Sequence, residues 1–229
     1  DSILNPSMDF YGSVGVNFSV LETIRTVLPD AKYLMLSSAA VYGNPVSLPI
    51  RESHTLNPIS PYGYHKVMVE TLIEEYCNVY GLHTCSARIF SVYGPGLKKQ
   101  ILWDIYQKSG KDMPISLFGT GEESRDFIFV QDIAHAIQII LEKSNFTGNI
   151  YNIANGYEVS IKKISRLFVD ALDFENKEIV FTGETKLGDP KRWHADIEQI
   201  NKMGYSPSVS LEQGIYEYAK WVKKYGKKQ

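Results

Sequence analysis

Residues 33–43 read YLMLSSAAVYG, and this stretch decides how the rest of the chain is interpreted. Its first part, Tyr33 to Leu36, is a continuous apolar run, which is typical of a strand buried on both faces of a parallel sheet. Two hydroxyl residues, Ser37 and Ser38, follow directly. Ligands of open α/β sheets bind at the carboxyl ends of the strands, so both serines are candidate ligand contacts. A turn in which they cap backbone groups explains them equally well.

Helix-type and strand-type segments alternate around this strand. The spacing of apolar residues predicts helices over 14–28 and 61–80 and a further strand over 84–90. This alternation is typical of a parallel α/β sheet. Little more than two strand–helix units are present, which is too few for a complete doubly wound sheet. We therefore expect a small sheet or one with strands absent from this chain. The second half adds predicted helices over 101–108, 132–142, 160–172 and 211–225, and strands over 115–118, 127–130, 149–154 and 179–181.

Composition excludes several classes of protein. The 229 residues, 44% hydrophobic and 22% charged, suit a globular protein of one large domain or two small ones. A net charge of −2 provides no field that would recruit nucleic acid or an anionic membrane. No stretch approaches the roughly 18 apolar residues of a membrane span. The first eight residues lack a basic and an apolar region, so we expect no secretory signal.

Cysteine and histidine spacing gives no indication of a metal site. Cys77 and Cys85 are the only cysteines, and they are too far apart in sequence for a Cys-x-x-Cys motif. The five histidines show no His-x-x-x-His spacing, so we predict no bound metal. Two free thiols are typical of a reducing compartment, and we expect a cytoplasmic protein.

Tyr62 and Lys66 form a candidate catalytic pair. They are four residues apart at the start of a predicted helix and therefore lie on one face. An ammonium group beside a phenol lowers the pKa of the phenol from about 10, which makes a usable general base. The spacing alone is weak, because the sequence holds 15 tyrosines and Tyr216/Lys220 repeats the pattern inside an ordinary amphipathic helix.

Basic residues near glycine turns form a candidate anion site. Arg125 follows Gly119-Thr120-Gly121, and the run 186–192 reads KLGDPKR. Lysine and arginine in such turns suit a pyrophosphate. Taken one at a time, they are more simply explained as exposed basic residues on loops.

Taken in order, these segments resemble the extended short-chain dehydrogenase/reductase superfamily, and within it the nucleotide-sugar epimerase/dehydratase branch, of which UDP-glucose 4-epimerase is the familiar member. The resemblance extends over nearly the whole chain, which makes it far more specific than any single motif. The matching runs are SVLETIR (19–25), SSAAVYG (37–43), PISPYGYHK (58–66), RIFSVYGPG (88–96), GTGEESRDFIFVQD (119–132), NIYNIANG (149–156) and GDPKRWHAD (188–196).

The resemblance implies an α/β fold: a partial Rossmann-like parallel sheet, with the N-terminal strands missing, and a smaller α/β substrate-binding domain. Residues 1–95 would be the C-terminal part of the dinucleotide-binding domain. Residues 96–229 would mainly form the substrate-binding domain, with about 125–155 returning to the sheet. The implied reaction is NAD-dependent epimerisation of a nucleotide-diphosphate sugar, with NADP not excluded as cofactor.

The resemblance also implies roles for individual residues. Tyr62 would be the general base, Lys66 would bind the nicotinamide ribose and tune Tyr62, and Ser38 would be the third catalytic residue. Contacts to the cofactor are implied for Ser37, Tyr62, Lys66 and Phe90, and contacts to the substrate for Ser91, Arg125 and Lys186.

Departures from the family pattern leave alternatives open. The Gly-x-x-Gly-x-x-Gly turn that holds the dinucleotide pyrophosphate is not in this sequence, so we expect this chain alone to be inactive. Ala39-Ala40 stands where 4,6-dehydratases have Asp-Glu, which disfavours a dehydratase. A dehydratase, a reductase or a cofactor-free sugar-nucleotide-binding fragment remain alternatives. The resemblance also suggests a homodimer built from the helices over 14–28 and 61–80.

Overall fold

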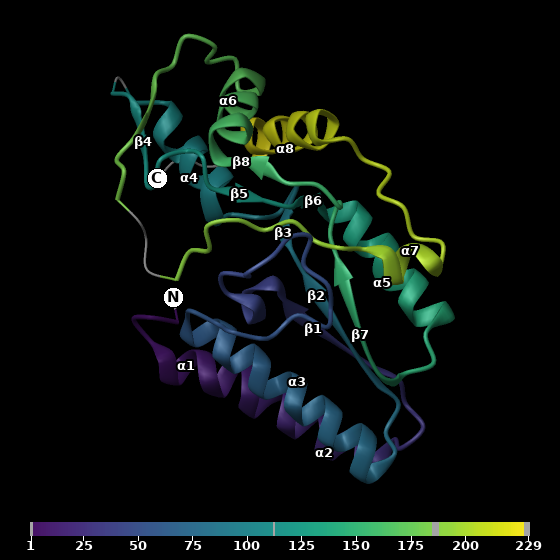
Figure 1. Cartoon of the computed structure of the whole chain (residues 1–229). Helices are drawn as coiled ribbons and strands as arrows, with labels where there is room; N and C mark the ends of the chain where they lie inside the picture. Colours follow the sequence, from purple (N-terminus) through teal and green to yellow (C-terminus); the bar gives the residue numbers. More distant parts are fainter. Residues whose placement is uncertain (1, 112, 185–187, 227–229) are drawn as a thin grey trace.

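A small parallel sheet lies at the centre of the molecule (Figure 1). The computed structural model describes residues 2–111, 113–184 and 188–226. Strands β1 (Tyr33–Ser38), β2 (Thr84–Ile89) and β7 (Thr147–Ile153) pair in parallel, in the order β1-β2-β7. The prediction of a parallel α/β sheet is confirmed, and β1 is an edge strand of the described sheet.

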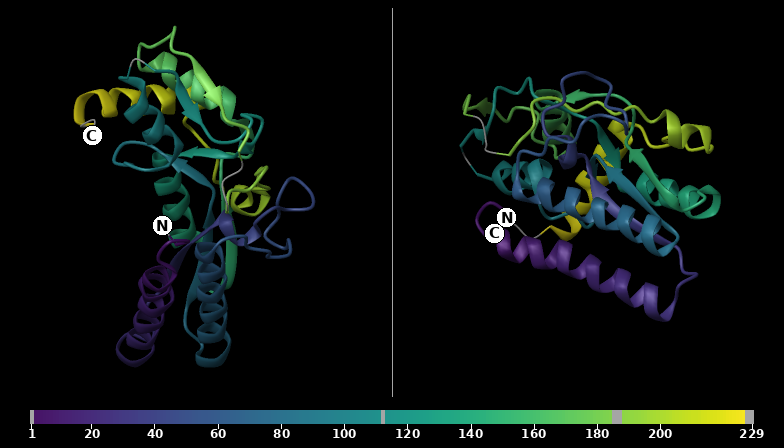
Figure 2. Two further views of the ribbon diagram at one scale, coloured as in Figure 1. Left: turned by 90° about the vertical axis from the view of Figure 1, so that its left-hand side faces the viewer. Right: turned by 60° about the horizontal axis from the view of Figure 1, so that its bottom comes forward.

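Two long helices cover one face of this sheet. Helix α2 (Val16–Val27) and helix α3 (Pro61–Tyr80) run side by side, as Figure 2 shows from two directions. Leu21 of α2, Met35 of β1 and Ile73 of α3 are all buried in the core between these elements. The sequence predicted both helices, and the structure confirms them.

Helix α3 begins and ends where the sequence places its signals. The Ser60 side chain accepts a hydrogen bond from the amide of Gly63 at 3.2 Å, and Pro61 is the first helical residue. Gly81 ends the helix in the left-handed conformation, with φ of 71°. These caps fix the register of α3, and therefore which of its residues face the end of β1.

The helix expected over 14–28 has a more irregular start. A short helix α1 (Pro6–Phe10) leads into one turn of π-helix (Tyr11–Gly15) before α2 begins. Both segments pack against α3. A π-turn contains more residues per turn than an α-helix, and such turns inside α-helices occur frequently at functional sites.

Helix α5 (Val130–Lys143) and the short helix α7 (Glu198–Lys202) cover the opposite face of the sheet. Cys85 and Ala87 of β2 are buried there in one cluster with residues of α5. The cover reaches Leu34 of β1 but not Leu36, which is 46% exposed. The expectation that this strand is buried on both faces is therefore wrong at Leu36, which lies at the edge of the sheet.

The second half of the chain builds its own apolar core. Phe168 and Tyr218 stack at its centre, with ring centroids 5.3 Å apart, and neither is exposed. The helices around this core are α4 (Gln100–Ser109), α6 (Ile161–Ala171) and α8 (Leu211–Tyr225). The short strand pairs are β4 (Ile115–Leu117) with β9 (Ile179–Phe181), β3 (Ser91–Tyr93) with β6 (Phe127–Phe129), and β5 (Ser124–Arg125) with β8 (Val159–Ser160).

Candidate active site

The carboxyl end of β1 runs directly into a buried turn. Ser38 is still extended, and its Oγ accepts a hydrogen bond from the amide of Ala40 at 3.2 Å. A single 3-10 turn follows over Ala39–Tyr42, and Ala39 and Tyr42 are almost fully buried. The capping role expected as the alternative for Ser38 is therefore present. It leaves the Ser38 hydroxyl able to donate a further hydrogen bond.

Gly63 brings the start of α3 against this turn. A Cβ built at Gly63 would lie 2.6 Å from the backbone oxygen of Ala40 and 2.9 Å from Cβ of Pro58. Any larger residue would push the helix away, so glycine is required for the close approach. Tyr62, the neighbouring residue, is thereby held beside Ser38, with which its phenol interacts.

Tyr62 and Lys66 lie together as the spacing predicted. The Lys66 ammonium is 5.6 Å from the centroid of the Tyr62 ring, and its Nζ donates to the backbone oxygen of Leu36 at 2.9 Å. Burial raises the pKa of the Tyr62 phenol, although Ser38 opposes this, and burial lowers the pKa of Lys66. The expected lowering of the Tyr62 pKa is therefore not found in the protein without ligands, since desolvation outweighs the favourable contacts.

The irregular start of α2 packs against the same helix face. Asp9 Oδ2 lies 2.5 Å from Nδ1 of His65, which is buried. The hydroxyl of Ser13, within the π-turn, is buried and has no hydrogen-bond partner among the residues that the structure describes. This segment therefore places a carboxylate and an unsatisfied hydroxyl against the helix that carries Tyr62 and Lys66.

Three further predicted contacts lie on the ends of β1, β2 and β3. Ser37 is 4% exposed, and its Oγ donates to Oε1 of Glu70 at 2.5 Å. Phe90 is 4% exposed, and its ring packs on Trp193 with centroids 6.0 Å apart. Ser91 is partly exposed at the start of β3. The side chains of Ser37 and Phe90 thus contact protein, and only Ser91 of the three presents a partly open side chain.

Arg125 is a partly buried cation in the second half of the chain. Its guanidinium lies 5.5 Å from the ring centroid of Trp193, and Nη1 donates to the backbone oxygen of Ser124 at 2.8 Å. No carboxylate among the described residues comes within ion-pair distance of it, and burial lowers its pKa. Lys186, predicted to act with Arg125, lies outside the described residues.

Asp126, the neighbour of Arg125, is a buried carboxylate to which no single sequence pattern pointed. It is fully buried, and its carboxylate accepts backbone hydrogen bonds from Asn155 at 2.8 Å, Gly156 at 3.1 Å and Ala195 at 3.2 Å. Burial raises its pKa to about 7, against the effect of these three donors. Asp126 thus ties the loop after β7 and the segment before Ala195 to the strand that carries Arg125. Its only signal in the sequence is its place within the matching run SRDFIFVQD.

Two searches of the described residues were negative. Over 2–111, 113–184 and 188–226, no group of three or more histidine, cysteine or acidic residues could hold a metal ion. No described helix is both long and apolar enough to cross a membrane.

Comparison with known proteins identifies the family. Residues 1–154 match the family described as "NAD dependent epimerase/dehydratase family". This chain belongs to that family. The match includes β1, the turn after it and the whole of α3, and therefore every residue of the Ser38, Tyr62 and Lys66 cluster.

Several relatives are named epimerases of nucleotide sugars, and others are named dTDP-D-glucose 4,6-dehydratases. A Methanocaldococcus jannaschii protein named "Putative UDP-glucose 4-epimerase" is 32% identical over 232 residues, which cover 97% of this chain and 73% of the relative. A solved UDP-N-acetylglucosamine 4-epimerase from Methanobrevibacter ruminantium, in complex with UDP-N-acetylmuramic acid, matches with a TM-score of 0.86 at 26% identity. The match covers 97% of this chain and 72% of that one.

A third related structure was solved with both a nucleotide sugar and NAD bound. The UDP-glucuronic acid 4-epimerase of Bacillus cereus, solved with UDP-glucuronic acid and NAD, matches with a TM-score of 0.85 at 28% identity. It covers 93% of this chain and 67% of the solved chain. The chain spans only 54 to 66% of four other curated relatives. These neighbours confirm that the sheet is part of a Rossmann-like fold.

Proposed function

We propose that this chain carries the catalytic residues and the nucleotide-sugar side of an NAD-dependent UDP-sugar 4-epimerase. One observation carries the proposal: the phenol of Tyr62 lies with both Ser38 and Lys66 at the carboxyl end of β1. A phenol between a hydroxyl and an ammonium group is suited to accept a proton from a sugar hydroxyl. Family membership and the UDP-sugar 4-epimerases among the relatives support the same reaction.

The residues present fit one half of a dinucleotide site. Among the described residues, Lys66 makes one hydrogen bond, to Leu36, so its ammonium retains donors for ribose hydroxyls. The buried hydroxyl of Ser13, unsatisfied among the described residues, lies in the segment packed on the same helix. The glycine-rich turn for the pyrophosphate is not among the 229 residues, so contacts to that part of NAD would come from residues outside this sequence.

In the proposed mechanism, Tyr62 accepts the proton of the sugar hydroxyl while Ser38 donates a hydrogen bond to the same oxygen. Bound NAD supplies the hydride acceptor. Because burial raises the pKa of Tyr62, its phenolate needs positive charge nearby, and Lys66 provides it. Ser37 and Phe90 support this surface from within the protein, since both are buried.

The nucleotide sugar would be held through its diphosphate by Arg125, with Ser91 and Lys186 as further contacts. Arg125 suits this role because no described carboxylate lies within ion-pair distance of it, although Asp189 and Glu123 act on its charge from farther away. A planar guanidinium can bond two phosphate oxygens at once. Stacking on Trp193 holds its plane in one orientation.

Two other functions are less well supported. A 4,6-dehydratase would require carboxylates after Ser38, where this chain has Ala39, fully buried, and Ala40. A sugar-nucleotide-binding fragment without chemistry is favoured only by the missing glycine-rich turn. Uptake of NAD would distinguish an enzyme from such a binding fragment.

We further propose that the chain pairs with a second copy through α2 and α3. Large apolar side chains are exposed on both helices: Val16 (53%) and Phe18 (49%) on α2, and Tyr64 (53%) and Met68 (45%) on α3. Exposed apolar surface of this extent often marks an interface. Sedimentation equilibrium at micromolar concentration would show a dimer, and a monomer alone would contradict this proposal.

The experiment that tests the proposed function is an assay of nucleotide content. The purified protein is denatured, and the supernatant is assayed for NAD(H), with the intact mass measured in parallel. NAD bound as purified, together with the dinucleotide half on a longer chain or a partner, and interconversion of UDP-sugars by that protein are the expected results. The 229-residue chain alone is expected to be inactive. A protein that includes the dinucleotide half and neither contains nor takes up NAD would contradict the proposal.

A further inference from the structure

Three side chains at four-residue intervals on α3 meet the end of β1. Residues at this interval lie on one face of a helix, so the three form a single row along it. The proposed reaction assigns roles to the first two members of the row, Tyr62 and Lys66, and none to the third, Glu70. The contacts are Tyr62 with Ser38, Lys66 Nζ with the backbone oxygen of Leu36 at 2.9 Å, and Glu70 Oε1 with Oγ of Ser37 at 2.5 Å.

Glu70 is a buried carboxylate paired with a buried arginine. Glu70 is 7% exposed and Arg88 of β2 is 2% exposed. Arg88 donates from Nη2 to Oε2 of Glu70 at 2.7 Å and from Nε to Oε1 at 3.0 Å. Such a pair is costly to desolvate, and it persists only where further hydrogen bonds satisfy both groups. The hydroxyl of Ser37 supplies one of these bonds on the carboxylate side.

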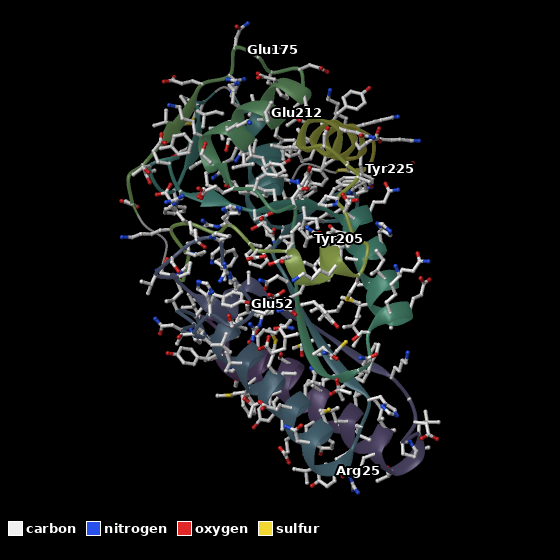
Figure 3. All side chains as sticks on the ribbon, turned by 45° about the vertical axis from the view of Figure 1, so that its right-hand side comes forward. Arg25, Glu52, Glu175, Tyr205, Glu212 and Tyr225 are labelled. Atoms are coloured by element: carbon white, nitrogen blue, oxygen red, sulfur yellow. The ribbon has the colours of Figure 1, made fainter. Side chains whose placement is uncertain are left out.

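The arginine is fixed from the opposite side. Its guanidinium lies 4.8 Å from the centroid of the Tyr42 ring, and Nη1 donates to the Tyr42 hydroxyl at 2.7 Å. The same Nη1 also donates to the backbone oxygen of Glu52 at 2.9 Å. Tyr42 in turn donates to Oδ1 of Asn152 on β7 at 2.7 Å. Figure 3 labels Glu52, which lies between the long helices and the second half of the chain. Glu70 is therefore anchored through residues of every strand of the central sheet.

We propose that Glu70 is a positioning residue for the catalytic row: it fixes the end of β1 through Ser37 and holds a negative charge one helical turn beyond Lys66, which favours the ammonium form of Lys66. The inference rests on the proposed function, because the charge of Lys66 matters to the reaction only where Tyr62 is the base. Glu70 does not touch substrate in this scheme, and it acts through its neighbours.

The charges around Lys66 support this assignment. Burial lowers the pKa of Lys66, and Asp9 and then Glu70 raise it. The other charged or titratable groups are Tyr62, His65, which contacts Asp9 directly, and Arg88, which is paired with Glu70. Loss of the Glu70 charge would leave the Arg88 cation without its partner, which lowers the pKa of Lys66 in the same direction. Asp9 is on the short helix α1 with a side chain that is 22% exposed, whereas the Glu70 side chain is 6% exposed. Solvent and salt therefore screen Glu70 less than Asp9, so its effect persists at high ionic strength.

The test is a titration of Lys66 by NMR in the isolated chain. Lysine-selective ¹³C labelling reports each ammonium, and the signal that disappears in Lys66→Arg identifies Lys66. In Glu70→Gln the midpoint of the Lys66 titration falls, because the nearby negative charge is gone. The fall exceeds that in the matched control Glu74→Gln, an exposed carboxylate one turn further along the same helix.

A Lys66 midpoint in folded Glu70→Gln equal to that of Glu74→Gln would overturn the inference. Glu70→Gln leaves Arg88 without its carboxylate and could unfold, so circular dichroism is recorded first. Glu70→Asp is the second variant: it keeps the charge and withdraws it by one methylene. We then expect a smaller fall, and no fall relative to Glu74→Gln would contradict the inference. Neither measurement needs NAD or turnover, so the proposed function can fail while these results stand, and the reverse.

Discussion

The junction of β1 with α3 and the region around Arg125 differ in how their buried charged side chains are paired. At the junction, Glu70 and Arg88 are paired with each other and hydrogen-bonded to their neighbours. Arg125 is partly buried too, yet its hydrogen bonds to described residues go to backbone oxygens, and no described carboxylate forms an ion pair with it. The charges of the first region are paired with each other, whereas the charge of the second has no ion-pair partner among the described residues. That difference suits the diphosphate contact proposed above for Arg125.

The two regions also differ in how their backbones are held. Side chains from β1, β2 and α3 join at the junction. In the other region one carboxylate, Asp126, accepts the amides of Asn155, Gly156 and Ala195 with no cation bonded to it among the described residues. Substitutions at the junction should therefore affect chemistry and stability, and those around Arg125 should affect ligand affinity and the response to pH.

The largest effect is expected from Tyr62→Phe, which removes the proposed base and keeps the ring. Turnover of a UDP-sugar by NAD-loaded protein should fall by about 10²- to 10⁴-fold, the usual contribution of a general acid–base group. Affinity for the UDP-sugar, measured by calorimetry, should change little. Tyr64→Phe is the matched control, because Tyr64 is 53% exposed two residues away. Equal turnover in both variants would rule out Tyr62 as the base.

The next largest effect is expected on stability, from Arg88→Met. Glu70 would be left buried without its cation, and the free energy of unfolding should fall by about 3–5 kcal/mol. Urea unfolding followed by circular dichroism measures the change. Arg51→Met is the control, because Arg51 pairs with Asp196 at the surface with its side chain 69% exposed. That pair should contribute about 1 kcal/mol or less. Similar losses in the two variants would mean that burial of the pair has no special consequence.

The response to pH should come from the region around Arg125. Burial raises the pKa of Asp126 to about 7, so the folded state binds a proton that the unfolded state has already released above pH 4. The free energy of unfolding should therefore fall as pH rises towards 7, by at most about 1.4 kcal/mol per pH unit. Urea unfolding between about pH 5 and 7 tests this.

The same series in Asp126→Asn should show a flatter slope. Some slope would remain, because burial also raises the pKa of Glu52 in the same direction. Arg25 and Tyr76 lower the pKa of Glu22 to about 2, so Glu22 changes the free energy of unfolding only at pH values below this range. An unchanged slope in Asp126→Asn would show that Asp126 is ionised throughout, stabilised by its three amide donors.

The sequence predicted what depends on strong local patterns. The caps of α3, the apolar run of β1 and the Tyr62/Lys66 spacing lie where expected. It missed elements of two to five residues, such as β5, β8 and α7, because they are too short to show a period. It also missed Glu70, since the bonds of Glu70 to Ser37 and Arg88 join residues that are distant in sequence.

Arg125→Gln should affect ligand affinity and leave stability nearly unchanged. Loss of a charge-assisted contact to a diphosphate should weaken binding by about 1.5–3 kcal/mol, which is roughly 10- to 100-fold in Kd. Calorimetry with UDP measures this in the isolated chain without NAD. The glutamine retains an amide that can stack on Trp193, and no described carboxylate is stranded by the loss of the cation, so stability should be nearly unchanged. Arg25→Gln is the matched control, because Arg25 lies at the far end of α2 (Figure 3), where it donates to Glu22 and lies over the ring of Tyr80. Equal affinities for UDP in the two variants would place Arg125 among the stabilising charges and remove the contrast between the two regions.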